Sequence, residues 1–173
     1  MPSPIDETPA QRVAYGPGLK RAAKAAAVVA AVGGVVELVV GPHRITSVVF
    51  LLVGTGMGAI VGRSLARTLR EWADDAAQVT ETERAALGNA HASPYAIVAL
   101  AIAGVTAVVV PVLYNVPTPL PGGLAALAVQ AWLQARAVDD VEARRQGIVM
   151  RPVRRLSFSG EELRLLPHPA DES

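Results

Sequence analysis

Four long apolar stretches, separated by short turns or by charged segments, dominate the sequence. Two lie close together near the start, at 25–41 and 45–62, and two lie later, at 95–116 and 120–135. A helix needs about 20 apolar residues, with a range of about 17 to 25, to cross the hydrocarbon core of a bilayer. The pattern therefore predicts an all-α integral membrane protein, with four transmembrane helices arranged as two helical hairpins.

The turns between paired stretches are rich in proline and glycine. Gly41 and Pro42 follow the first stretch, and three prolines follow the third. Proline cannot continue the helical hydrogen-bonding pattern, and glycine permits a sharp change of direction. The fourth stretch is the shortest and holds Gln130 and Gln134. A re-entrant or surface-lying helix is therefore the alternative to a full span at this position.

The charged segments that follow each pair favour helices that continue into water. After the second stretch, five apolar residues recur at helical spacing on one face, and they are Leu65, Leu69, Trp72, Ala76 and Val79. Thr80 and Glu83 then have the spacing of a capping box, which predicts a second short helix. After the fourth stretch the helix is expected to continue to Gly147. Residues 148–158 are compatible with a short strand, but we expect no core in so short a tail.

This organisation divides the chain into five segments. They are a mobile N-terminal tail (1–19), a first hairpin (20–62), a charged helical loop (63–94), a second hairpin (95–136) and a basic C-terminal tail (137–173).

Composition narrows the class of protein further. Charged residues make up 18% of the chain, against about 25% in average globular proteins, and none lies between Ala85 and Ala135. The net charge of +1 and the low aromatic content argue against a nucleic-acid binder. The chain has no cysteine, which excludes disulfides and thiolate metal sites. The bias toward Ala, Val and Arg suggests a bacterial source.

The distribution of basic residues predicts the orientation in a cell membrane. Lysine and arginine cluster before the first span, between the second and third spans, and after the fourth. The two hairpin turns hold a single basic residue, Arg44. Cytoplasmic segments of membrane proteins carry an excess of basic residues. We therefore expect a multi-pass protein of the plasma membrane with both termini in the cytoplasm.

Glu37 is the candidate for a functional acid within a span. A carboxylate inside the membrane is costly, so such residues often serve proton relays or cation sites. Glu37 is also only four residues from Gly41, which is about 6 Å along a helix. The alternative is therefore a structural role near the outer surface, where it is protonated, reaches water, or pairs with His43 or Arg44.

Glycines recur every four residues in the second stretch, at Gly54, Gly58 and Gly62. Such a strip lets another helix approach closely. The partner helix belongs either to the same chain or to a second subunit.

A basic stretch beside the last span is expected to contact anionic lipid head groups. Its residues are Arg144, Arg145, Arg151, Arg154 and Arg155. No motif for nucleic-acid binding accompanies them.

No catalytic, cofactor or metal-binding pattern stands out in the sequence, and we expect neither enzymatic activity nor a cofactor. Helix packing and cytoplasmic helices instead favour a small accessory or scaffold membrane protein, whose partner is another membrane protein or a second copy. The alternative is a homo-oligomeric small transporter or channel that uses Glu37 as its proton- or cation-responsive group.

Overall fold

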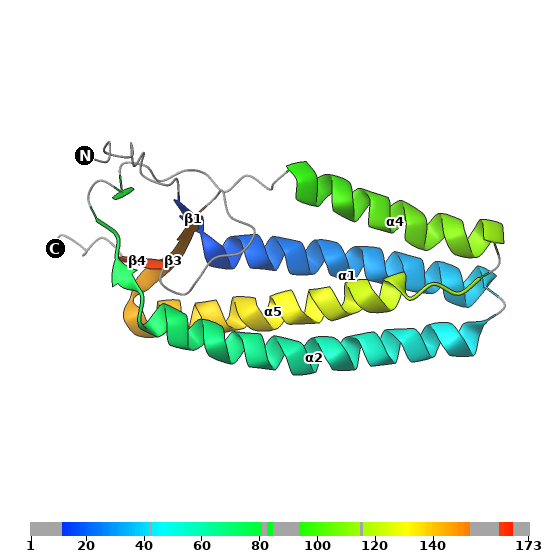
Figure 1. Cartoon of the computed structure of the whole chain (residues 1–173), viewed down its shortest axis with the longest axis horizontal. Helices are drawn as coiled ribbons and strands as arrows, with labels where there is room; N and C mark the ends of the chain where they lie inside the picture. Colours follow the sequence, from blue (N-terminus) through cyan, green and yellow to red (C-terminus); the bar gives the residue numbers. More distant parts are fainter. Residues whose placement is uncertain are drawn as a thin grey trace, which may run out of the picture.

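The chain is mostly helical, with a small sheet at one end of the helices (Figure 1). The computed structural model describes residues 12–41, 43–80, 83–84, 94–114, 116–152 and 163–167, and at 94–100, 108 and 111 it describes the backbone alone. The long helices in this part of the chain are α1 (Tyr15–Val40), α2 (Arg44–Asp74), α4 (Pro94–Tyr114) and α5 (Leu120–Arg145). The strands are β1 (Arg12–Ala14), β2 (Ala77–Gln78), β3 (Gly147–Pro152) and β4 (Arg164–Pro167).

α5 is the central helix of the bundle. It lies between α1 and α2 and packs along both, whereas α1 and α2 touch each other little (Figure 1). α4 lies on the outer side of α1 and makes little contact with α5, its successor in the chain. The prediction of two helical hairpins is therefore wrong in its packing, because neither consecutive pair forms the main interface. The contacts with α5 hold the first two helices together.

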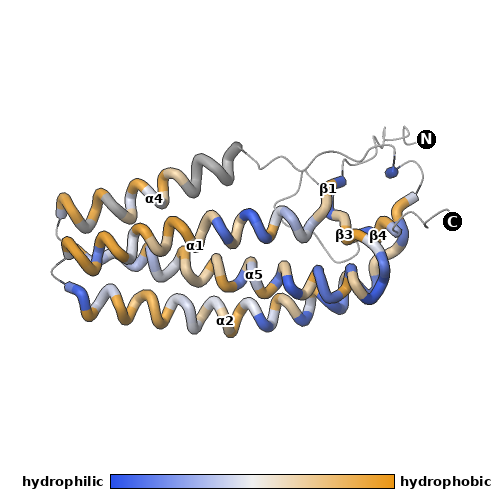
Figure 2. Tube along the Cα trace, turned by 180° about the vertical axis from the view of Figure 1, so that it is seen from behind, coloured by the Kyte–Doolittle hydropathy of each residue, from blue (hydrophilic) through white to orange (hydrophobic). Residues whose placement is uncertain are grey.

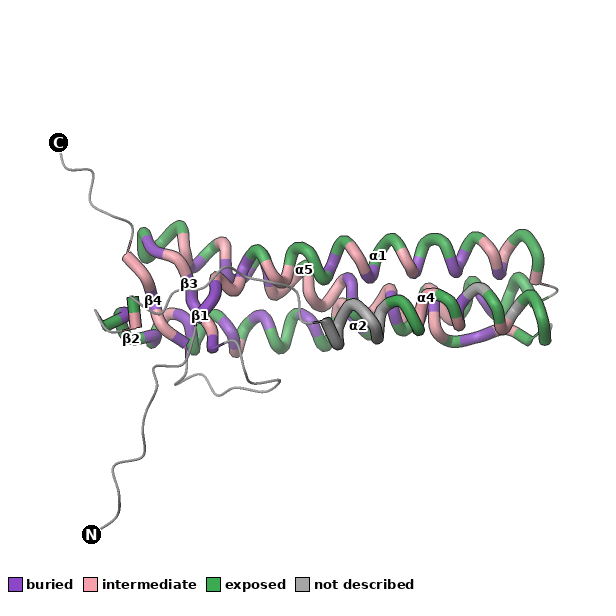
Figure 3. The backbone as a smooth tube through the Cα atoms, turned by 90° about the horizontal axis from the view of Figure 1, so that it is seen from above, coloured by how far each residue is buried: buried purple, intermediate pink, exposed green. Residues whose placement is uncertain are grey.

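In the half of the bundle away from the sheet, small residues face inward and large apolar residues face outward. The buried positions of α1 include Ala26, Ala30 and Gly33. By contrast, Ile60 of α2 is 71% exposed and Val39 of α1 is 67% exposed. Hydrophobic residues predominate along this half of the helices, and hydrophilic residues become frequent toward the sheet (Figure 2). Buried positions recur along the inner faces, with exposed ones between them (Figure 3).

At the other end, a small folded unit has the opposite arrangement. We call it the cap: the sheet β1-β3-β4-β2 together with the ends of α1, α2 and α5 that pack on it. β3 pairs antiparallel with β1 and with β4, and β2 pairs parallel with β4. Large apolar side chains fill its core, and they are Leu69, Val138, Val141, Val149, Leu163 and Leu165.

The cap corrects three expectations from the sequence. The chain is not all-α, since it contains this sheet. The mobile tail predicted through residue 19 is wrong for 12–19, because β1 pairs with β3 and α1 already begins at Tyr15. The tail after residue 147 does contribute a core, because Val149 and Leu165 bury their side chains against α2 and α5.

The segment 63–94, where the sequence predicts a charged helical loop, begins as the last part of α2. α2 continues to Asp74, and α5 ends at Arg145 with Gln146 in the left-handed conformation. After α2 the chain enters β2, a strand that the sequence pattern does not predict. Most of the short helix expected after Thr80 lies outside the described residues.

The glycine strip of α2 lies directly against the backbone of α5. The strip consists of Gly54, Gly58 and Gly62, and the nearest residues of α5 are, in turn, Gly122, Ala126 and Gln130. A Cβ atom on Gly58 would stand 2.5 Å from the carbonyl oxygen of Ala126, closer than real Cβ atoms approach. Both series ascend by four, so α2 and α5 run parallel. The missing side chains allow the two main chains to touch.

Adding one methyl group to this contact should destabilise the bundle. In Gly58→Ala, the new Cβ would clash with the main chain of α5, and overpacking of this kind costs about 1–3 kcal/mol. Gly56→Ala is the matched control, because a Cβ there meets nothing within 4 Å. We expect a lower thermal unfolding midpoint in detergent for Gly58→Ala and an unchanged midpoint for Gly56→Ala. Equal midpoints would show that the close approach is not required.

Candidate functional site

Glu37 is sealed inside the bundle at the end opposite the cap. It is 2% exposed, and its carboxylate Oε1 accepts two hydrogen bonds from Thr118. The Thr118 hydroxyl donates at 2.6 Å and the Thr118 backbone N–H at 3.0 Å. A buried carboxylate is tolerated only when such donors replace water. The bonds therefore tie the end of α1 to the link between α4 and α5.

The position of Thr118 explains why it can serve Glu37 in this way. It is one residue before Pro119, the N-cap of α5. Groups at a helix N-terminus have backbone N–H donors without partners inside the helix, and the helix dipole favours negative charge there. The carboxylate from α1 thus meets the start of α5 where a negative charge is best accommodated.

The structure separates the other polar candidates of the apolar helices from Glu37. Gln130 lies beside Gly62 where α2 and α5 touch. His43 is exposed and is the N-cap of α2. The side chain of Pro111 and residue Asn115 lie outside the described residues. The structure joins Glu37 to Thr118 and not to His43 or Arg44, the partners considered from the sequence.

The basic residues predicted to contact lipid hold parts of the cap together. Arg144 forms an ion pair with Asp74 at 3.0 Å, and Arg145 donates a hydrogen bond of 2.7 Å to the Asp74 carbonyl oxygen. The Arg151 guanidinium lies 5.5 Å from the centre of the Tyr15 ring. Arg154 and Arg155 lie outside the described residues. Contact of these arginines with lipid stays a prediction.

Ion pairs also fix α5 against both of its neighbours at the charged end. Lys20 of α1 contacts Asp139 at 2.7 Å, and Arg70 of α2 contacts Asp140 at 3.0 Å. Each exposed pair contributes little energy by itself. Because the two acids are adjacent on α5 and reach different helices, they specify which side of α5 faces α1 and which faces α2.

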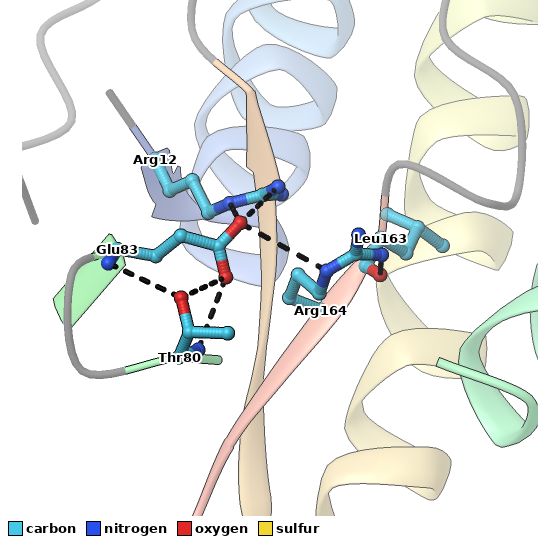
Figure 4. Close-up of polar contacts among 5 residues, drawn as sticks. All are labelled: Arg12, Thr80, Glu83, Leu163 and Arg164. Carbon is cyan, nitrogen blue, oxygen red and sulfur yellow. Dashed lines mark hydrogen bonds and ion pairs between the residues drawn. The ribbon is translucent and has the colours of Figure 1, made fainter. Parts of the chain in front are cut away.

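A partly buried network around Glu83 joins β1 and β4 of the cap to the segment at Thr80 (Figure 4). Arg12 of β1 donates two hydrogen bonds to Glu83 Oε1, from Nε at 3.0 Å and from Nη2 at 2.7 Å. Arg164 of β4 lies 3.9 Å from the same oxygen. Thr80 donates to Glu83 Oε2 from its backbone and its hydroxyl, both at 3.1 Å, and its hydroxyl accepts the Glu83 N–H. The capping box predicted from the sequence is therefore present.

Among the described residues, Tyr15 and Glu83 have shifted pKa values. Burial raises the pKa of the Tyr15 phenol, although the charge of Arg151 acts against this shift. Burial also disfavours the charged form of Glu83, but the hydrogen bonds from Thr80 and Arg12, together with the Arg12 charge, outweigh it and lower the pKa of this carboxyl. Glu83 is thus held as an anion between two arginines.

Sequence reasoning missed several of the residues that matter in this arrangement. Thr118 sits between prolines, where no periodic signal marks a partner for Glu37. Arg136 stacks on Trp132, with its guanidinium 4.1 Å from the ring centre. The spacing of four residues on one helix could have revealed this pair. Within the described residues, no cluster of three or more histidine, aspartate or glutamate side chains is placed to hold a metal ion.

Comparisons with protein-family models, curated proteins and solved structures give no match to this chain.

Removing the Thr118 hydroxyl should destabilise the bundle without changing its shape. Thr118→Val leaves Glu37 with one donor fewer in a buried place, and such a loss costs about 1–3 kcal/mol. Thr55→Val is the control, because the exposed Thr55 hydroxyl bonds only to Leu51 O of its own helix. We expect a lower thermal midpoint for Thr118→Val than for Thr55→Val. In a cycle with Glu37→Gln, additive losses would contradict a direct interaction.

Acidification should loosen the cap through Glu83. Its pKa is lowered from a usual value of 4.5, so its stabilising contribution is complete above pH 4.5 and is lost as pH falls through the lowered value. Protection of the β1 amides from hydrogen exchange, corrected for intrinsic rates, should therefore fall as the pH is lowered below 4.5. Glu83→Gln should weaken this dependence, and the exposed Glu71→Gln should retain it. The same pH dependence in parent and Glu83→Gln would refute the role of Glu83.

Proposed function

We propose that this chain is a small multi-pass membrane protein that acts as an accessory or scaffold subunit. The observation that carries the proposal is the reversal of packing along the helices. Near the glycine strip, small residues lie inside and large apolar residues such as Leu52, at 68% exposure, lie outside. In the cap, large apolar residues lie inside. Lipid is as apolar as a leucine side chain, so outward leucines cost nothing there, whereas in water they belong in the core.

The lengths of the apolar segments support this placement. α1 and α2 are long and apolar enough to cross a membrane, and most of their apolar residues are not buried. Residues 25–40 and 45–62 would span about 24 Å and about 27 Å as helices, close to the thickness of a hydrocarbon core of about 30 Å. α4 contributes a shorter apolar segment, Ala101–Tyr114. α5 would cross the bilayer within the bundle, shielded by α1 and α2.

The distribution of charge supports an orientation with the cap in the cytoplasm. The basic ends of α1, α2 and α5 lie with the sheet at one end, and the α1–α2 turn and the α4–α5 link lie at the other (Figure 1). Under the positive-inside rule the basic end faces the cytoplasm. Both described ends of the chain, at Arg12 and Pro167, belong to the cap. We therefore propose the plasma membrane of a bacterium, with both termini inside.

The surroundings of Glu37 support a scaffold more than a transporter. Proton and cation pathways use acids that reach water or a polar cavity. Glu37 is 2% exposed, and among the described residues Thr118 donates both hydrogen bonds to its carboxylate. The glycine strip is likewise occupied by α5 of the same chain. The polar and small residues of the spans thus serve internal packing, which leaves the outer faces of α2 and α4 for a partner.

Single cysteines can test the membrane placement directly, because the chain has none of its own. We expect Arg44→Cys, at the exposed start of α2, to react with an impermeant maleimide on intact cells. Glu71→Cys, near the cap, should react only after the membrane is opened. Ile60→Cys, on the outer face of α2, should resist in both cases. Labelling of Glu71→Cys and Ile60→Cys on intact cells would refute the orientation.

The scaffold role is tested by isolating the chain from its native membrane in lipid nanodiscs. A different protein present in one-to-one amount is the expected result. A homo-oligomer of this chain alone that conducts ions or protons would instead favour transport. In that case Glu37→Gln and Thr118→Val separate the roles. Loss of flux in Glu37→Gln with retained flux in Thr118→Val would assign chemistry to the carboxylate and contradict the scaffold.

A further inference from the structure

A groove between α1 and α5 lies where the apolar half of the bundle meets the charged end. Its volume is about 540 Å³, within the range of small-molecule sites. On α1, Ala23 and Ala27 line it, and on α5, Ala128 and Val129 line it. The remaining lining residues are Ala135 and five charged or aromatic residues, Lys20, Lys24, Trp132, Arg136 and Asp139. We call this cavity the boundary groove.

The groove has an apolar end and a cationic end. Ala27 and Ala128 lie toward the apolar half, and Lys24 and Arg136 mark the change to charged residues. Trp132, which is 46% exposed, lies between the two ends. Tryptophan favours the level of the head groups in a bilayer, because its ring is amphipathic. The order along the groove therefore matches the order of acyl chain, glycerol region and head group in a phospholipid.

The charges of the groove leave a net positive site at this level. Asp139 neutralises Lys20 through an ion pair of 2.7 Å. Lys24 is exposed and has no acidic partner among the described residues. Arg136 is held over the ring of Trp132 at 4.1 Å, which keeps its guanidinium beside the groove. Two cations thus stand at the mouth of an apolar groove.

We propose that the boundary groove binds one anionic phospholipid, with its phosphate between Lys24 and Arg136 and an acyl chain along the alanine walls. The proposal rests on the membrane placement proposed above. It differs from the basic stretch at 144–155, since Arg144 lies eight residues beyond Arg136, which is about 12 Å farther along α5. A soluble anion would leave the apolar end of the groove empty, so a lipid fits both ends.

Trp132 offers a local reporter of the occupant. The chain has two tryptophans, so Trp72→Phe leaves Trp132 as the sole tryptophan. In this background, the chain is reconstituted into phosphatidylcholine vesicles that contain a small fraction of lipid brominated on its acyl chains. Bromine quenches nearby tryptophan. We expect brominated phosphatidylglycerol to quench Trp132 several-fold more efficiently than brominated phosphatidylcholine, since each basic residue contributes about fivefold to binding of anionic lipid.

Paired variants connect the preference to the groove. Lys24→Gln with Arg136→Gln should abolish the head-group preference. Arg63→Gln with Arg67→Gln removes two exposed cations near the same level of α2, outside the groove, and should retain it. Ala27→Phe fills the groove and keeps both cations, so it should lower quenching by brominated phosphatidylglycerol, and Ala22→Phe, also exposed but not lining the groove, should not.

Several results would overturn the proposal. Equal quenching by the two lipids in the parent, or a preference that persists in Lys24→Gln with Arg136→Gln, would refute a specific site. Loss of the preference when glycerol 3-phosphate is added at matched ionic strength would assign the groove to a soluble anion. Recovery of the chain away from the vesicles on flotation would instead refute the membrane placement itself, so the two failures are distinguishable.

Discussion

The contact between the main chains of α2 and α5 at the glycine strip determines the rest of the structure. It requires the two helices to run parallel in one register. α5 therefore lies between α1 and α2, which would contact each other directly in a simple hairpin. From that register follow the pairings of Asp140 with Arg70 and of Asp74 with Arg144 at the charged end. At the opposite end, the same placement of α5 brings Thr118 to Glu37.

α1, α2 and α5 each pack in two different ways along their length. In α2, Gly58 is buried where the outer residues are apolar, and Leu69 is buried where the outer residues are charged. Under the proposed placement, the point at which the buried residues change from small to large lies at the surface of the bilayer. Because the helices pass through it without interruption, the cap and the membrane bundle form one continuous body. A partner that binds the cap therefore contacts the same helices that, in the proposed placement, cross the membrane.

What the sequence predicts correctly is local in the chain. The helix end near Gly147 and the capping box of Thr80 and Glu83 depend on neighbours within a few residues, whereas the helix predicted through Val79 ends at Asp74. The errors concern contacts between distant residues. β1 pairs with β3, which lies far along the chain. α4 packs on α1 and has little contact with α5, and the donor to Glu37 is 81 positions away. Periodicity predicts which face of a helix is apolar, but it does not predict which other element packs against that face.

The central position of α5 has a consequence for the order in which the chain is made. When the ribosome has released α1 and α2, those helices have little to hold them together, and Glu37 lacks the donor that later covers it. β1 lies among the first described residues, and it cannot pair until β3, which lies much later in the chain, has been synthesised. The folded arrangement is therefore complete only after β3 has been synthesised, and a chain truncated between α2 and α4 is left as an open pair of helices in which Glu37 lacks Thr118.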